Sequence, residues 1–71
     1  MIRAKFKCDS VNVSNENENI SLSAVTEGSI ENEQWSKYTP GGHLTITISN
    51  PEAQGKIEVG KEYYLDITLA E

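Results

Sequence analysis

The sequence predicts a small all-β protein, mainly antiparallel, with one or two short helical turns. Its sheet either curls or closes into an OB- or SH3-like barrel. Apolar and polar residues alternate with period two in several separate segments. Glycine, proline and asparagine clusters separate these segments, as turns between strands do. The chain has 71 residues, which suits a single β domain over residues 1–71.

The first strand is expected from residue 2 onward. Its apolar face consists of alternate residues, namely Ile2, Ala4, Phe6 and Cys8. The apolar phase then moves by one residue to Val11 and Val13, which predicts a β-bulge near residues 9–10. Residues 14–19 contain no hydrophobic side chain, so they predict an exposed hairpin loop whose acids, including Glu18, are solvated.

A second strand is expected over residues 20–24, followed by a break in the pattern. Residues 30–38 fit either one or two helical turns or an excursion between strands, and Ser29 and Asn32 do not form a capping box. Residues 39–42, Thr-Pro-Gly-Gly, form a strong turn signal because proline presets φ and glycine accepts positive φ.

The third strand is the clearest, because aliphatic residues and threonines alternate over residues 43–49. Residues 50–55 resemble a short helix with an asparagine cap and proline at its first position. A short extended piece is expected at 56–59, a tight turn at 60–61, and the last strand at 62–70.

The apolar faces of these strands define the predicted core, with Trp35 or Tyr63 as a lid. Its members are Phe6, Leu22, Leu44, Ile46, Ile48, Ile57, Leu65 and Ile67. Alternation assigns Tyr63 to the inside and Tyr64 to the outside. An open meander covered by residues 27–42 is the alternative to a curled sheet.

Composition and residue chemistry argue against an enzyme. The net charge of −5 disfavours a general nucleic-acid binder. Cys8 is the only cysteine and lies on an apolar face, and the lone His43 follows a turn. The paired acids lie in polar segments where they keep ordinary pKa values. We therefore expect no catalytic residue, no metal site and no cofactor. The sequence also predicts no membrane span and no secretory leader.

Three basic residues, Arg3, Lys5 and Lys7, share the outer face of the first strand. One interpretation is protection of an edge strand against aggregation. The other is a binding stripe, formed if exposed aromatic residues lie beside it, as in single-strand nucleic-acid binders. The candidate binding residues are Arg3, Lys5, Lys7, Trp35, Tyr38 and Tyr64.

Three motifs carry a resemblance to a known group. They are RAKF at residues 3–6, KYTPGGHLTITISNP at 37–51 and GKEYYLD at 60–66. With these motifs the chain resembles small, functionally uncharacterised proteins of tailed bacteriophages and prophages over nearly its full length. It departs from them at Ile57 and Val59, where the group has an aromatic residue and a proline. The resemblance implies a viral origin and a host-cytoplasm setting, and it transfers no catalytic residue.

The first functional hypothesis is a non-enzymatic phage or prophage accessory protein. Its protein partner would be a virion component or a host defence factor, and the protein would be cytoplasmic or virion-associated. The alternative is an OB-like single-stranded nucleic-acid-binding protein that uses the basic stripe and exposed aromatics. A small ligand between protomers is a third hypothesis that the sequence neither supports nor excludes. Self-association into a homo-oligomer is also expected, because a chain this short builds only a small core.

Overall fold

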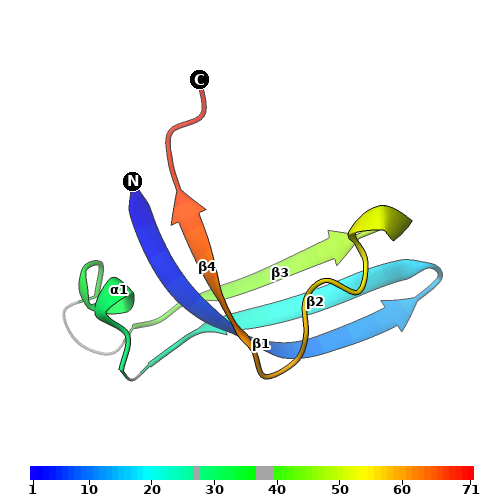
Figure 1. Ribbon diagram of the computed structural model, residues 1–71, viewed down its shortest axis with the longest axis horizontal. Coiled ribbons are helices and arrows are strands. Elements are labelled where there is room, and N and C mark those ends of the chain that lie inside the picture. The colour runs from blue at the N-terminus through cyan, green and yellow to red at the C-terminus, as the bar shows by residue number, and fades with distance from the viewer. Residues whose placement is uncertain (27, 37–39) are drawn as a thin grey trace.

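The computed structural model describes residues 1–26, 28–36 and 40–71, and consists mainly of one antiparallel sheet. The strands are β1 (Ile2–Ser14), β2 (Asn17–Ala24), β3 (His43–Ile48) and β4 (Glu62–Ile67), with two short helices, α1 (Ile30–Glu33) and η1 (Pro51–Ala53). Their order in the sheet is β3-β2-β1-β4 (Figure 1). The predicted antiparallel β fold is confirmed. The sheet is curled and unclosed, because β3 and β4 remain its two edges.

β1 is long enough to serve two neighbours, and the predicted bulge divides it. Its first half pairs with β4, from Ile2 opposite Ile67 to Lys7 opposite Glu62. Its second half pairs with β2, and the register shifts between Cys8 and Ser10. A bulge adds local twist and bends the strand. The two halves of β1 therefore form two arms that diverge from the bend (Figure 1).

The hairpin between β1 and β2 is tighter than the predicted loop over residues 14–19. Asn15 and Glu16 have φ angles of 52° and 66° and form a two-residue turn. Such turns match the twist of the flanking strands, so pairing continues up to Ser14 opposite Asn17. The expectation that Glu18 is a solvated loop acid is therefore wrong. Its side chain is buried, and one carboxylate oxygen accepts from the backbone N–H of Gly55 at 3.1 Å.

The helix start after β3 is confirmed. Asn50 caps η1 by accepting from the N–H of Glu52 at 3.1 Å, and proline occupies the first helical position. The expected extended piece at 56–59 is not a strand. The chain instead reaches β1 at the bulge, where the Gly60 N–H donates to the Cys8 carbonyl at 2.9 Å. The last strand ends at Ile67 rather than at residue 70.

α1 is joined to the sheet by one fully buried side chain, Asn32. Its Oδ1 accepts from the Lys5 backbone N–H at 2.7 Å, and its Nδ2 donates to the Lys5 carbonyl at 2.8 Å. The same amide nitrogen donates to the Val25 carbonyl at 2.8 Å, and Oδ1 also accepts from the indole of Trp35 at 3.1 Å. The Asn32 carboxamide thus bonds β1 as a strand residue would, at the point where β2 has ended.

The core is small and centres on β1 and β2. Its buried apolar members are Ala4, Phe6, Cys8, Ile20, Leu22 and Ala24. Phe6 and Leu22 confirm the prediction, and Leu44, Ile48, Ile57 and Leu65 are partly buried against this cluster, as are Trp35 and Tyr63. Ile46 and Ile67 are 41% and 62% exposed, so their assignment to the core is wrong. Both lie on edge strands of a sheet that does not close.

Candidate functional site

The basic stripe lies on an inner strand of the sheet. β1 pairs with β4 over Ile2–Lys7 and with β2 over Phe6–Ser14. Since β1 is not an edge strand, the interpretation of its lysines as edge protection is wrong. On β4, the residues opposite Arg3, Lys5 and Lys7 are Asp66, Tyr64 and Glu62. Directly opposite residues point to the same face of an antiparallel pair. The register therefore places two carboxylates and one aromatic ring against the three basic residues.

Arg3 and Asp66 form a two-pronged ion pair. Arg3 Nε lies 2.7 Å from Asp66 Oδ1, and the second guanidinium nitrogen lies 3.0 Å from Oδ2. This planar geometry is the favourable one for arginine and a carboxylate. The hydrogen bonds from Arg3 lower the pKa of Asp66 below its ordinary value.

Lys5 is held by acids from two different elements. Its Nζ lies 3.4 Å from Glu31 Oε1 on α1 and 3.9 Å from Glu62 Oε1 on β4. The hydrogen bond with Glu31 raises the pKa of Lys5 above its ordinary value. Because Asn32 fixes α1 on β1, it also places Glu31 beside this lysine.

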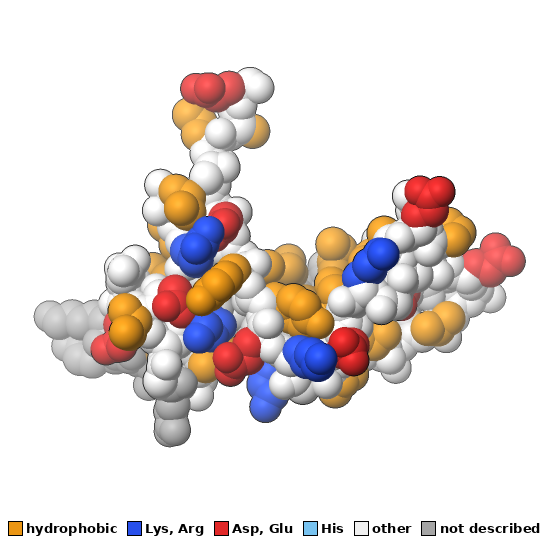
Figure 2. All heavy atoms as spheres, viewed as in Figure 1, with side chains coloured by type: hydrophobic (Ala, Val, Ile, Leu, Met, Phe, Trp, Pro, Cys, Tyr) orange, Lys and Arg blue, Asp and Glu red, His pale blue; other side chains and the backbone are white. Residues whose placement is uncertain are grey.

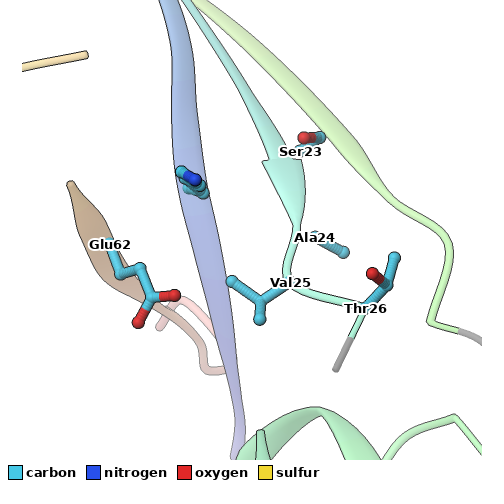
Figure 3. Close-up of a pocket in the computed structure, with 6 residues that line it drawn as sticks. Ser23, Ala24, Val25, Thr26 and Glu62 are labelled. Carbon is cyan, nitrogen blue, oxygen red and sulfur yellow. The ribbon is translucent and has the colours of Figure 1, made fainter. Parts of the chain in front are cut away.

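Lys7 lies at the end of the stripe, beside a shallow polar pocket. Figure 3 shows Glu62 of β4 on one side of β1, with the end of β2 and the segment after it on the other. The remaining lining residues are Ser23, Ala24, Val25 and Thr26.

Tyr64 is the most exposed aromatic of this face, with 55% of the residue accessible. The guanidinium carbon of Arg3 lies 4.9 Å from the ring centroid, and Lys5 Nζ lies 5.8 Å from it. Both distances are within cation–π range. The Tyr64 surface, as we define it, comprises Arg3, Lys5, Tyr64 and the carboxylates Glu31, Glu62 and Asp66. Figure 2 shows acidic and basic side chains interleaved over this arm.

The structure therefore brings together part of the predicted binding set. Arg3, Lys5, Lys7 and Tyr64 share one face. Trp35 lies elsewhere: it borders an apolar hollow on the opposite face together with Ala4 and Phe6. Tyr38 lies outside the described residues. Sequence reasoning missed the acids that compensate the stripe. Alternation places Asp66 on the same face of its strand as Tyr64. Only the pairing of β4 with β1 shows that Asp66 lies opposite Arg3.

The reactive side chains lie apart from this surface. Cys8 is buried in the core, and its Sγ donates weakly to the Ser10 carbonyl at 3.7 Å. His43 is exposed at the start of β3. Within residues 1–26, 28–36 and 40–71, no group of three or more metal-ligating side chains could hold an ion. None of the helices in the described part of the chain is long and apolar enough to cross a membrane.

Comparison with known proteins gives no further assignment. No protein-family model matches the chain, and searches of curated proteins and of solved structures find no significant match.

We expect Asp66→Asn to flatten the acid limb of the pH–stability curve. The pKa of Asp66 is lowered in the folded state, so its ion pair stabilises the fold above the ordinary carboxyl pKa of about 3.9. That contribution disappears as pH falls through the lowered pKa. The effect is small because the pair is exposed. NMR titration of Asp66 and urea unfolding between about pH 5 and pH 2 check this. A midpoint at or above the ordinary value would contradict it.

Proposed function

We propose that this protein is a non-enzymatic accessory protein of a phage or prophage that acts by binding another protein through the Tyr64 surface. The observation that carries the proposal is the half-exposed Tyr64 ring, held beside two cations that already have carboxylate partners. Tyrosine and arginine dominate protein-binding hot spots. A ring held in place by its neighbours also loses little side-chain entropy when it is covered.

The electrostatics of the same surface favour a protein partner over a nucleic acid. Each cation beside Tyr64 faces a carboxylate, at 2.7 Å for Arg3 and 3.4 Å for Lys5. The whole chain carries a net charge of −5. Binding of a polyanion depends on uncompensated lysines and arginines that release counterions. A protein partner, in contrast, accommodates alternating charges around a central aromatic ring.

The phage assignment and the host setting are supported by the three sequence motifs. In that setting the partner is a virion component or a host defence factor. An acidic protein whose contact surface surrounds an aromatic ring with two cations and three carboxylates suits a partner whose binding site is basic around an apolar pocket. The protein then acts in the host cytoplasm or on the virion.

We expect Tyr64→Ala to weaken partner binding by about 30-fold or more, as truncation of a hot-spot aromatic does. Tagged wild-type protein is expressed in the bacterium that carries the gene, and captured proteins are quantified by mass spectrometry. Calorimetry with the purified partner then gives the affinity. The matched control is Thr45→Ala, an exposed residue on β3, which is expected to leave the affinity unchanged.

The result that contradicts this proposal is a partner whose affinity is the same for wild type and Tyr64→Ala. Capture of no partner by the wild type contradicts it as well. Binding of a single-stranded oligonucleotide would support the alternative function, provided that it weakens steeply with salt and with Lys5→Glu and Lys7→Glu.

A further inference from the structure

The face of the sheet opposite the Tyr64 surface is apolar and open. Because the sheet curls, residues of both edge strands border one hollow of about 460 Å3. A second hollow shares its floor, at Ala4 and Phe6, and extends to Ile2. We call this region the apolar trough, and its side chains are Ile2, Ala4, Phe6, Leu44, Leu65 and Ile67.

The apolar lining of the trough is partly exposed. Ile67 is 62% accessible, and Ile2, which lies opposite it on β1, is 47% accessible. His43, Tyr64 and Asp66 also border the hollow, and the Asp66 carboxylate is bonded to Arg3. β3 itself, with the sequence HLTITI, carries no lysine, aspartate, glutamate or arginine. Its pairing with β2 shows no bulge. Edge strands usually carry a charge, a proline or a bulge that prevents association.

The solvent-accessible area of the chain is larger than that of a typical monomer of this mass, as expected if a neighbour is missing. A folded monomer of 7.9 kDa typically exposes about 4,400 Å2, whereas this chain exposes 5306 Å2. The excess of about 900 Å2 is close to the ~800 Å2 that each partner contributes to a standard interface. Among the described residues the core contains six buried apolar side chains, which is few for a domain that folds alone.

We infer that the trough is closed by a second copy of this chain in a two-fold homodimer. In a two-fold dimer the same patch of each copy contacts its counterpart, so one self-complementary surface is enough. The trough supplies apolar side chains and an uncharged edge strand to both sides. Two chains that each carry −5 repel one another, and the trough is a mainly apolar face whose bordering acid, Asp66, is paired with Arg3.

This inference does not depend on the proposed function. Tyr64 and Asp66 also border the hollow, but the Tyr64 ring lies beside Arg3 and Lys5, on the face of β1 and β4 opposite Ala4 and Phe6. A dimer closed over the trough leaves a Tyr64 surface exposed on each copy. It therefore presents two equivalent sites to a partner, and engagement of both raises the apparent affinity.

The test measures mass in solution. Light scattering after size exclusion is expected to give twice 7.9 kDa for the wild type. Ile67→Lys on β4 and Ile2→Lys on β1 are each expected to reduce the mass to that of one chain, because both residues line the trough and a lysine in the interface is desolvated without a partner. Ile30→Lys is the matched control, because Ile30 is 71% exposed and lies on α1. It is expected to remain dimeric, as is Tyr64→Ala.

A second measurement needs no variant. The Tm of a dimer rises with protein concentration, by about 4–5 °C for each tenfold increase at this chain length. A wild type with the mass of one chain and a constant Tm would overturn the inference. A dimer that survives both trough substitutions, or one that Ile30→Lys dissociates, would also overturn it. Retention of the dimer by Tyr64→Ala, with loss of partner binding, would support both proposals separately.

Discussion

Asn32→Ala is expected to lower the free energy of unfolding by about 3–4 kcal/mol, because it removes hydrogen bonds from several partly buried groups at once. The Asn32 carboxamide bonds both the N–H and the carbonyl of Lys5, the carbonyl of Val25 and the indole of Trp35. Alanine supplies none of these bonds. Water replaces only part of them, because the site lies between α1 and β1.

Two further variants separate this effect from loss of the helix. Ser29→Ala removes only the cap of α1, whose Oγ accepts from the Asn32 N–H at 3.2 Å, and is expected to cost about 1 kcal/mol. Asn32→Asp keeps the shape of the side chain but turns a carboxylate oxygen toward two carbonyls. It is therefore expected to destabilise at least as much as alanine. Urea unfolding measures all three. An Asn32→Ala cost no larger than that of Ser29→Ala would contradict this role.

Asn32 also shows where sequence reasoning fails. Periodicity identifies strands because alternate side chains face the same side. It correctly placed the bulge near residues 9–10 and the opposite orientations of Tyr63 and Tyr64. A different local signal, an asparagine cap followed by proline, correctly placed the start of η1. A polar residue that completes a sheet with its side chain has no periodic signal. Its role depends on where β2 ends and on which segment passes there.

The core prediction fails for a related reason. Alternation identifies which face of each strand is apolar, but strand order decides how much of that face is covered. Ile20 and Ile46 are opposite each other on neighbouring strands and share the apolar face. Ile20 is fully buried between β1 and β3, whereas Ile46 lies on the edge. The sequence predicted Ile46 for the core and omitted Ile20.

The candidate site was predicted in part for the same reason. The basic stripe was visible from spacing alone, and so was the outward orientation of Tyr64. The interpretation of the stripe changed once the structure showed that β1 is an inner strand and that β4 pairs with it. This pairing brings Asp66 and Glu62 opposite the basic residues. Charge compensation is a property of strand pairing. A local pattern in the sequence does not reveal it.

Ile20→Ala is expected to cost about 3–4 kcal/mol, in the upper part of the range for a fully buried aliphatic residue. Ile20 is 0% exposed and lies opposite Val11 on β1 and Ile46 on β3. Strands on both sides restrict collapse of the cavity, so the loss includes a cavity cost beyond the transfer of the side chain from water. For a 71-residue domain the total stability is about 4–10 kcal/mol. The variant therefore loses a large part of it.

The control for this prediction is a second isoleucine that is exposed, so that two isoleucines of different burial are compared. Ile20→Val removes one methyl group and is expected to cost about 1 kcal/mol, whereas Ile30→Ala on exposed α1 is expected to change stability by less than about 0.5 kcal/mol. All variants are compared by urea unfolding at one protein concentration, since dimerisation makes stability depend on concentration. If Ile20→Ala and Ile30→Ala had equal effects, β2 would not be the buried centre of the sheet, and the arrangement that separates the Tyr64 surface from the apolar trough would fail with it.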